Sequence, residues 1–392
     1  MSYKAIYSYA WDLAESGVAE ATRTFRELGL DTVTLAGSYH AGKFMRPLGK
    51  AGKVYFPVDG AAYFQTDPAR YGTIKPRANS LLPDRDLFRE LTDQGEMAVN
   101  AWLVLLHNTP LGMAHPEAVV RNAFGDPYYY NLCPSAPDVR QYAVALARDV
   151  TETYPVSGVS MESPGFTPYA HGYHHEFELM KSNAWLENLL GLCFCDHCLS
   201  GAEAQGIDAR RLKARVAEDI TSYLESDLDY PDDMAEAFWR ADLVENDELR
   251  RYLDLRCSVV TSLVADIRAA VRPDATVAVI PSVARPTAGC WYEGSDLHAL
   301  ARTTGLSEAC FYEAGPERVK ADLFDIRRRL QGEGKLRGIL RPAHPDFDSP
   351  GALQEAVETL QAGGVEEIAF YNWGHLRPRN LAWIGKVLGG TA

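Results

Sequence analysis

The feature that most constrains the fold of this chain is an alternation of short, apolar, β-rich runs with amphipathic stretches of helical period. Near-continuous apolar strands separated by helices are typical of a parallel sheet, because parallel neighbours must be joined by a crossover. Eight candidate strands can be counted, at residues 5–11, 32–39, 97–106, 158–162, 276–283, 306–312, 336–342 and 367–373. Eight such units predict a (β/α)8 TIM barrel rather than an open, doubly wound sheet. No G-x-G-x-x-G motif follows the first strand, which argues further against the dinucleotide-binding form of the open sheet.

Two long segments interrupt this alternation. Residues 40–84, after the second strand, are rich in Gly, Pro, Tyr and Phe, and residues 163–245, after the fourth strand, contain a cysteine cluster and a His-rich patch. Barrel enzymes build their active sites on the loops that follow the C-terminal ends of strands. We therefore expect a single barrel domain over residues 1–392, with inserts after strands two and four, and with the 163–245 insert carrying the cysteine cluster.

Charge and hydropathy restrict the partners of the chain. Its 392 residues carry a formal net charge of −14, which argues against nucleic acid, because nucleic-acid-binding proteins display a basic face. The N-terminal residues lack the basic and apolar regions of a signal peptide, and no run approaches the roughly 18 apolar residues of a membrane span. We therefore expect a cytoplasmic protein with a small-molecule ligand and no membrane partner, while homo-oligomer formation stays open. The cysteines should then remain mostly thiols.

Polar and aromatic side chains follow the predicted strands. Carboxylates together with Trp and Tyr suit sugar binding, because the apolar faces of pyranoses stack on rings while the hydroxyls bond to charged groups. No nucleophilic Ser elbow and no phosphate-binding Gly loop accompany them. The predicted substrate-binding residues at these strand ends are Trp11, Asp12, His40, His107, Asn108, Tyr312, His344, Asp346, Asn372 and Trp373.

Two glutamates close predicted strands, Glu162 in VSGVSME and Glu313 in SEACFYE. Glycoside hydrolysis asks for two carboxyl groups, a protonated one for the leaving oxygen and an ionised one to attack or to activate water. Rigid placement at the mouth of the barrel makes Glu162 and Glu313 the predicted catalytic pair. Asp346 and Asp348 are rivals for the second carboxylate and Asp12 is a weaker one. Retention or inversion at the anomeric carbon stays open.

Histidines cluster in another motif, YAHGYHHEFELM. His171, His174 and His175 could supply metal ligands or hydrogen bonds to substrate, and an ordinary surface loop is an equal alternative. His344 and His375, near the predicted mouth, suit hydrogen bonds to sugar hydroxyls better than metal binding.

The stretch CFCDHC places Cys193, Cys195 and Cys198 within six residues. Zinc in a closed structural site takes four ligands in a tetrahedron, and Cys133, which follows the third strand, is the expected fourth. His197 is an alternative ligand that is poorly placed beside Cys198. The context does not fit a redox C-x-x-C, which begins a helix after a strand. We therefore expect a structural zinc that fastens the insert, with unmetallated thiols as the alternative.

Three motifs, NLCPSAPDVRQY, YPVSGVSMES and CFCDHC, carry a family resemblance over roughly residues 130–200. Together they resemble a group of barrel proteins regarded as glycoside-hydrolase-like. The cysteine trio is also similar to the zinc-binding cluster of bacterial β-galactosidases, which belong to the barrel clan whose acid/base follows strand four. The resemblance implies that Glu162 takes the strand-four carboxylate position. It also implies that the metal cluster is matched by Cys133, Cys193, Cys195 and Cys198.

The chain departs from that clan in two places. The clan has Asn-Glu at the end of strand four and a Glu nucleophile after strand seven, whereas this chain has Met161-Glu162 and HPDFD. Pairing strand four with strand six instead resembles the α-galactosidase arrangement, in which Glu162 would attack and Glu313 would be the acid/base. The roles of the two glutamates therefore stay open.

The sequence thus predicts a glycoside hydrolase that cleaves a short oligosaccharide or a small glycoside and uses no organic cofactor. The two long loops favour exo action. Two alternatives remain, namely a barrel lyase, isomerase or epimerase acting on a free sugar with a divalent ion, and a non-catalytic carbohydrate-binding barrel. An acidic mouth disfavours uronic acids unless Arg46, Arg285 or Arg341 lies in it.

Overall fold

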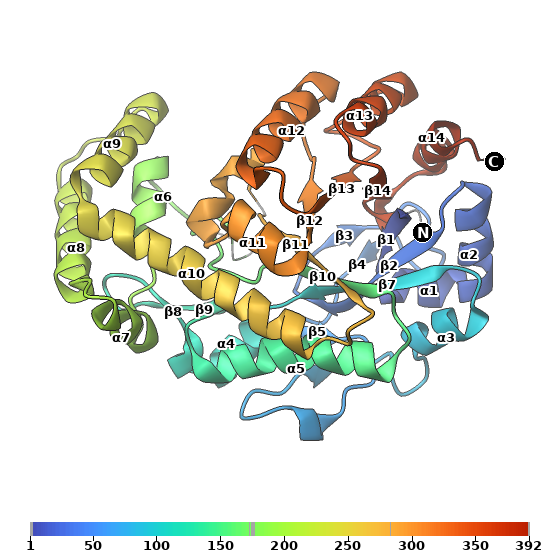
Figure 1. Cartoon of the computed structure of the whole chain (residues 1–392), viewed down its shortest axis with the longest axis horizontal. Coiled ribbons are helices and arrows are strands. Elements are labelled where there is room, and N and C mark those ends of the chain that lie inside the picture. The colour runs from blue at the N-terminus through green and yellow to red at the C-terminus, as the bar shows by residue number, and fades with distance from the viewer. Residues whose placement is uncertain (1–2, 172, 174–176, 283, 391–392) are drawn as a thin grey trace.

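The computed structural model describes residues 3–171, 173, 177–282 and 284–390. Eight parallel strands form a ring at its centre (Figure 1). In ring order they are β1 (Lys4–Ser8), β2 (Thr32–Tyr39), β7 (Ala98–Val104), β10 (Gly158–Glu162), β11 (Thr276–Ile280), β12 (Leu306–Cys310), β13 (Lys335–Leu340) and β14 (Glu367–Phe370). The ring closes because β1 pairs with both β2 and β14. The predicted (β/α)8 barrel is confirmed.

Helices surround the ring of strands (Figure 1). Those that alternate with the strands are α2 (Val18–Glu27), α3 (Leu87–Gln94), α5 (Pro137–Thr153), α10 (Asp247–Ala270), α11 (Leu297–Thr304), α12 (Pro316–Leu330), α13 (Pro350–Ala362) and α14 (Pro378–Leu388). Side-chain caps begin several of them. The Asp86 carboxylate accepts from the N–H of Arg89 in α3, and the Ser349 hydroxyl accepts from the N–H of Ala352 in α13. Within the described ranges, none of the helices is both long and apolar enough to span a membrane.

The deeper part of the barrel contains polar side chains that form hydrogen bonds to one another. Glu308 accepts hydrogen bonds from Tyr3 Oη at 3.0 Å and from the Ser160 hydroxyl, and Asn100 donates to Ser160 Oγ at 2.9 Å. The Arg337 guanidinium lies 3.7 Å from the centroid of the Tyr3 ring. These bonds join several strands and pair groups that burial would otherwise leave unsatisfied. A cavity lies above this layer, toward the C-terminal ends of the strands.

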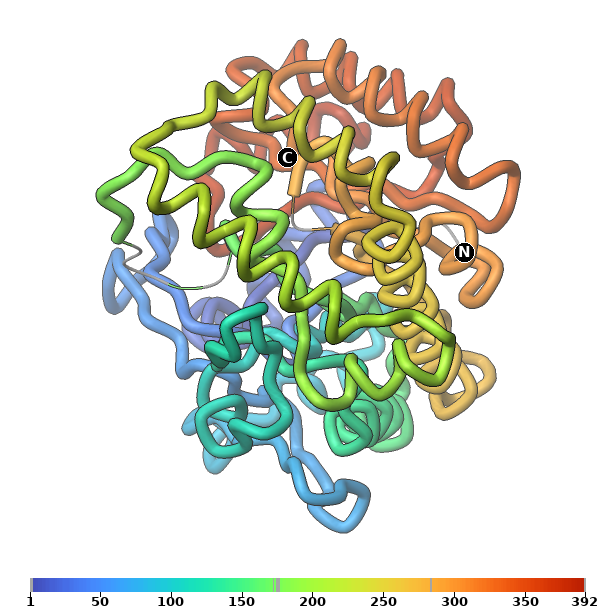
Figure 2. Tube along the Cα trace, turned by 90° about the vertical axis from the view of Figure 1, so that its left-hand side faces the viewer, coloured from blue at the N-terminus to red at the C-terminus, as the bar shows by residue number. Residues whose placement is uncertain are grey.

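Three long connections leave the C-terminal ends of strands. The connection from β2 to α3 contains β3 (Phe44–Met45), β4 (Val54–Tyr55), β5 (Ala61–Ala62) and β6 (Arg77–Ala78). The connection from β7 to α5 contains α4 (Thr109–Ala114) and the hairpin of β8 (Val119–Arg121) and β9 (Pro127–Leu132). The sequence did not predict an insert at this position. The connection from β10 to α10 contains α6 (Ala184–Leu190), α7 (Asp196–Ala204), α8 (Ala209–Glu225) and α9 (Asp232–Glu245). Helices α6 to α9 stand together at one end of the molecule (Figure 1, Figure 2).

The first strand is shorter than predicted. It ends at Ser8, and helix α1 (Ala10–Ser16) begins two residues later. Trp11 and Asp12 therefore lie in a helix and not at the end of a strand. A similar early turn follows β14, where the short 3-10 helix η4 (Trp373–His375) begins.

Candidate active site

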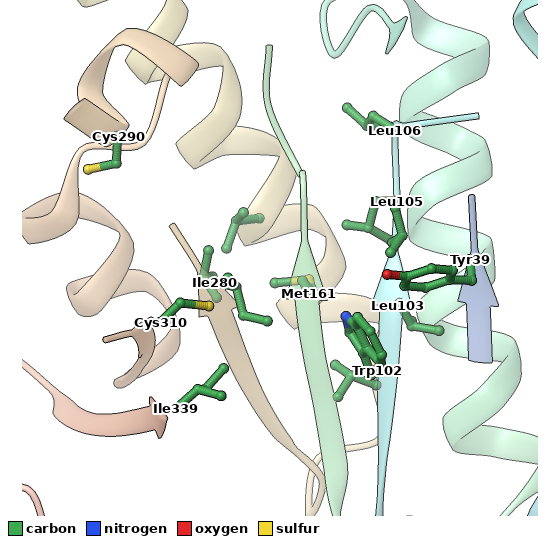
Figure 3. Close-up of a cluster of buried hydrophobic side chains, with 14 of the residues drawn as sticks. Tyr39, Trp102, Leu103, Leu105, Leu106, Met161, Ile280, Cys290, Cys310 and Ile339 are labelled. Carbon is green, nitrogen blue, oxygen red and sulfur yellow. The ribbon is translucent and has the colours of Figure 1, made fainter. Parts of the chain in front are cut away.

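A cavity of about 240 Å³ lies at the C-terminal end of the barrel, and its lining comes from all eight strands or the residues just after them. Its aromatic lining residues are Tyr7, Tyr39, Trp102, Tyr312 and Tyr371. Its other lining residues are His40, Glu162, His171, Ile280, Ser282, Arg285, Cys310, Ile339 and Arg341. Figure 3 shows Tyr39 and Trp102 on one side and Cys310 and Ile339 on the other, with their side chains pointing toward one another.

Hydrogen bonds fix the aromatic wall. Tyr9 Oη lies 2.7 Å from Tyr371 Oη and donates to Tyr39 Oη at 3.0 Å. The rings of Tyr7 and Trp102 meet edge-on with 5.1 Å between their centroids. Burial raises the pKa of Tyr371 to about 12, so its hydroxyl stays protonated at neutral pH. The wall therefore offers apolar ring faces and phenolic hydroxyls, a combination that suits sugars.

Glu162 is held at the end of β10. The indole Nε1 of Trp102 donates to its Oε2 at 2.7 Å. No further hydrogen bond or ion pair to this carboxyl occurs among the described residues, so its Oε1 is available to a ligand. Burial raises the pKa of Glu162, and the Trp102 hydrogen bond and the nearby charge of Arg285 oppose part of that rise. Within the described part of the chain, Glu162 is the single carboxylate that lines the cavity.

Two arginines line the cavity beside Tyr312. The guanidinium carbon of Arg341 lies 4.4 Å from the centroid of the Tyr312 ring, and that of Arg285 lies 5.1 Å from it. Asp346 holds Arg341 through two hydrogen bonds, from Nε at 2.7 Å and from Nη2 at 2.6 Å. Burial raises the pKa of Asp346, and Arg341 opposes this rise. Of the predicted residues, Tyr312 thus lies in the lining, while Asp346 lies behind Arg341.

Three histidines are in contact at one side of the cavity. The rings of His40 and His107 stack with 4.4 Å between centroids, and His107 meets His171 edge-on at 5.9 Å. His40 and His171 line the cavity, whereas His107 supports His40 from behind. His40 Nδ1 lies 2.7 Å from the main-chain oxygen of Ala41, so Nδ1 carries a proton that it donates to that oxygen. His174 and His175, the other two histidines of the YAHGYHHEFELM motif, lie outside the described residues.

Glu313 does not share the cavity with Glu162. Side chains alternate along an extended chain, so the residue after an inward-facing one points away from the barrel axis. Tyr312 lines the cavity, and Glu313 faces a separate cavity of about 340 Å³ on the other side. There its Oε2 accepts from Arg318 Nε at 2.7 Å. The structure therefore does not bring the predicted catalytic pair together.

Trp11 and Asp12 lie in α1, away from the lining. The Trp11 ring stacks on that of Tyr9 with 4.3 Å between centroids and is part of the buried core. Asp12 Oδ1 accepts from Arg46 Nε at 2.6 Å. Burial raises the pKa of Asp12 to about 6, although Arg46 opposes the rise. This ion pair joins α1 to the connection after β2, and it keeps Arg46 out of the lining as well.

Two predicted asparagines cap short helices instead of facing substrate. Asn108 Oδ1 accepts from the N–H of Leu111 at 3.1 Å, and its amide nitrogen donates to the main-chain oxygen of Gly60 at 3.1 Å. Asn372 Oδ1 accepts from the N–H of Gly374 at 3.0 Å. Both side chains are buried. Their Oδ1 atoms therefore accept from the backbone of the turns that leave β7 and β14, while the Asn372 amide nitrogen is buried without a partner among the described residues.

The remaining predicted residues are also outside the lining. Trp373 packs edge-on against Phe25 with 4.9 Å between centroids. The side chains of His344 and Asp348 are 87% and 94% exposed, so neither is held for catalysis. His375 Nδ1 lies 3.1 Å from the main-chain oxygen of Met45, and burial lowers the pKa of His375.

Four cysteines from two distant segments meet beside the barrel. Cys133 follows β9, whereas Cys193, Cys195 and Cys198 lie in and just before the first turn of α7. All four are buried free thiols, and their sulfur atoms lie within 4.8 Å of one another. His197 is exposed and is not part of this group. The predicted four-cysteine group is thus assembled, and it could bind a metal.

The spacing of the sulfur atoms fits a tetrahedral ion. From Cys133, the sulfur–sulfur distances are 3.5 Å to Cys198, 3.6 Å to Cys195 and 3.9 Å to Cys193. Four sulfurs about 2.3 Å from a central zinc would be about 3.8 Å apart. The main-chain N–H of Arg121 donates to Cys193 Sγ at 3.5 Å, as groups that orient metal thiolates do.

No protein-family model matches this chain, and neither does any curated protein. In fold, the chain is similar to the glycoside hydrolase domain of PgaB (BpsB) from Bordetella bronchiseptica, at 12% identity, with 98% of each chain covered and a TM-score of 0.62. It is similar to α-L-fucosidase isoenzyme 2 from Paenibacillus thiaminolyticus at 15% identity, covering 99% of this chain and 49% of that one, with a TM-score of 0.52. It is similar to the endo-1,4-β-mannanase from Rhizomucor miehei at 9% identity, covering 100% of this chain and 94% of that one, with a TM-score of 0.52. At these identities the likeness shows a barrel fold shared with glycoside hydrolases.

Proposed function

We propose that this chain is a glycoside hydrolase in which Glu162 protonates the leaving oxygen. The observation that carries the proposal is the environment of this one carboxyl, which lines a ring-walled cavity with one oxygen held by Trp102 and the other without a partner among the described residues. A carboxyl pKa raised by burial keeps a larger fraction protonated near neutral pH, which a general acid needs. The fold shared with glycoside hydrolases adds support.

In the proposed reaction, the bond between C1 and the glycosidic oxygen breaks and its electron pair stays on the oxygen. That oxygen takes the proton of Glu162. Water forms a bond to C1 and gives one proton to the Glu162 carboxylate, which restores the acid. The sequence predicted two catalytic carboxylates. In the described ranges only one of them, Glu162, lines the cavity. The tyrosine hydroxyls, His40 and His171 are proposed to bond to sugar hydroxyls while the ring faces stack on the sugar.

The size of the cavity supports a short substrate. Its volume of about 240 Å³ is below the range of about 300–1,000 Å³ that is usual for drug-sized ligands. We propose that one terminal sugar unit is bound in the cavity and the leaving group lies toward its opening. Cleavage would then proceed from a chain end.

A panel of aryl α- and β-glycosides of hexoses, pentoses and hexuronic acids tests the proposal. We expect saturable release of the aryl alcohol from at least one member. Turnover of a free monosaccharide that a chelator abolishes, with every glycoside intact, would instead support the isomerase or epimerase alternative. Sugar binding without turnover of any kind would support a carbohydrate-binding barrel.

The Trp102 hydrogen bond offers a test by pH dependence. Trp102→Phe removes the N–H that lowers the pKa of Glu162, so the pKa of Glu162 should rise. A general acid acts only when protonated, so activity is lost as the pH rises through its pKa. We therefore expect the basic limb of the profile of kcat/KM against pH to move upward by about one pH unit.

A matched control exists for this variant. Trp185 Nε1 donates to Asp242 Oδ2 at 2.7 Å in the α6–α9 segment, so Trp185→Phe removes an equivalent bond away from the cavity. Its basic limb should match that of the wild type. A basic limb that stays fixed or moves downward in Trp102→Phe would show that Glu162 does not control it.

We further propose that one structural zinc is held by Cys133, Cys193, Cys195 and Cys198. Support comes from the spacing of the sulfur atoms, their burial and the completeness of a four-thiol set. When bound, zinc would fasten β9 to α7. None of the four cysteines lines the cavity, so a structural role is proposed for the ion.

A further inference from the structure

One wall of the cavity carries positive charge in an otherwise acidic protein. Arg285 and Arg341 line this wall on either side of the β12 end, with their guanidinium carbons 5.1 Å and 4.4 Å from the centroid of the Tyr312 ring. The chain as a whole has a formal net charge of −14. Two arginines at the candidate site therefore need a local explanation.

The two arginines differ in their partners. Arg341 is held by the two hydrogen bonds to Asp346, which balance its charge and fix the plane of its guanidinium. Arg285 donates to the main-chain oxygens of Ser282 and Ala284, and it forms no ion pair within the described residues. Its Nε is buried and has no hydrogen-bond partner in that same part of the chain. Arg285 is half-buried and its charge is not paired directly with a carboxylate in the described ranges, so it retains the capacity to bind an anion.

Glu162 does not occupy the anion-binding groups of Arg285. Its carboxyl is bonded to Trp102 and forms no hydrogen bond to Arg285. As the proposed acid it is protonated, and therefore neutral, when substrate binds. Of the charged side chains that line the cavity in the described ranges, two are arginines and one is Glu162, so the lining itself is positive when Glu162 is protonated. An anionic group on the substrate would balance that charge.

We propose that the sugar bound by this site carries a carboxylate, as a hexuronic acid does, and that Arg285 and Arg341 bind this carboxylate. The inference rests on the proposed hydrolase function and adds the substrate class to it. The planar guanidinium matches a carboxylate through two parallel hydrogen bonds. A hexuronic acid carries its carboxylate on ring carbon C5, so the sugar ring can stack on Tyr312 while the carboxylate meets the arginines. Because Arg341 is already held in place, little of its freedom is lost on binding.

Matched substrates test the inference. The 4-methylumbelliferyl glucuronides are compared with the glucosides, and the galacturonides with the galactosides, in both anomeric forms. We expect kcat/KM for one uronide to exceed that of its neutral counterpart by at least about 100-fold. Arg285→Gln should lower kcat/KM for the uronide by about 10- to 100-fold more than it lowers kcat/KM for the neutral glycoside.

Two further variants are controls for the comparison of uronides with neutral glycosides. Arg318 pairs with Glu313 outside the cavity, so Arg318→Gln should leave the ratio of uronide to neutral glycoside unchanged. Arg285→Lys keeps the charge but loses the planar guanidinium, and it should lower the ratio of uronide to neutral-glycoside kcat/KM by less than Arg285→Gln does. Arg285→Lys also tests the inference if Arg285→Gln proves poorly folded.

The outcomes separate this inference from the proposed function. Equal turnover of neutral glycosides and uronides, unaffected by Arg285→Gln, would overturn the inference and leave the hydrolase standing. If no glycoside is cleaved, isothermal titration calorimetry with D-glucuronate, D-galacturonate and the corresponding neutral hexoses tests whether the cavity binds a carboxylate. Binding of a uronate alone, weakened in Arg285→Gln, would support the carboxylate site and overturn the hydrolase. Absence of uronate binding would overturn the inference.

Discussion

Replacing Glu162 by glutamine is expected to lower kcat by about 10²- to 10⁴-fold, the usual contribution of a general acid. The amide keeps the shape of the side chain and can still accept the hydrogen bond from Trp102, but its N–H protons are not acidic enough to be transferred to the leaving oxygen. The leaving oxygen would then depart as an unprotonated alkoxide, which is a poor leaving group. Steady-state rates on the best aryl glycoside, measured at the pH optimum, provide the comparison.

The variant should be folded, and the direction of its stability change follows from the raised pKa. The folded state holds the Glu162 proton more tightly than the unfolded state does. The stability contributed by this group is therefore complete below the unfolded pKa and is lost as the pH rises through the folded pKa. Glutamine does not ionise, so Glu162→Gln should be at least as stable as the wild type at alkaline pH. Thermal unfolding at acidic and alkaline pH checks this.

Glu313 supplies the matched control. It is a strand-end glutamate of the same barrel, but it pairs with Arg318 and faces another cavity. Glu313→Gln should therefore keep kcat within about threefold of the wild type, far from the loss that removal of a general acid causes. Near-wild-type turnover in Glu162→Gln, or a large loss in Glu313→Gln, would reverse the assignment made from the geometry.

Protein purified without chelator is expected to contain one zinc ion per chain, and Cys193→Ser is expected to lose it. The free energy of structural zinc binding is also free energy of folding, because the ligand set is assembled only in the native state. We therefore expect Cys193→Ser to lower the free energy of unfolding by more than about 4 kcal/mol. Elemental analysis gives the metal content, and denaturant unfolding gives the stability.

Cys257 is the control for the zinc proposal. Its thiol donates to the main-chain oxygen of Trp291 and lies outside the four-cysteine group. Cys257→Ser should keep the zinc content of the wild type. A fully stable, metal-free protein, or the same zinc content in Cys193→Ser and the wild type, would show that these thiols do not hold a structural ion.

The barrel could be predicted because its signal is repeated and local. Each strand is a short apolar run, and each is followed by a helix with an amphipathic period and a clear beginning, such as Ser349 ahead of α13. An error at one boundary, such as the early end of β1 at Ser8, does not change the count of units. Closure of the ring follows from eight parallel units.

The inward-facing residues could also have been found, since side chains alternate along strands. On three neighbouring strands the cavity is lined by residues two apart, namely Ile280 and Ser282, Cys310 and Tyr312, and Ile339 and Arg341. Once Tyr312 is placed inside, the same alternation places its neighbour Glu313 outside. The sequence prediction instead took every polar residue near a strand end, regardless of its side.

Other parts of the site depend on turns that periodicity does not reveal. Asn108 and Asn372 look like substrate ligands at strand ends, but the chain turns at once and their side chains cap the turns. Arg285 lies five residues beyond β11, so no strand pattern gives its direction. The cysteine group was predictable for the opposite reason, because the ligands of a predicted metal site must converge wherever their segments lie.

The dependence of rate on the leaving group is the most direct test that Glu162 delivers the proton. Aryl glycosides that differ only in the acidity of the departing phenol, from dinitrophenol to unsubstituted phenol, are compared in the wild type and in Glu162→Gln. Help from an acid matters least for dinitrophenol, so the variant should cleave that substrate at a rate close to the wild type and fall progressively behind as the phenol becomes less acidic. Parallel losses on every substrate, with no recovery for dinitrophenol, would contradict this role for Glu162.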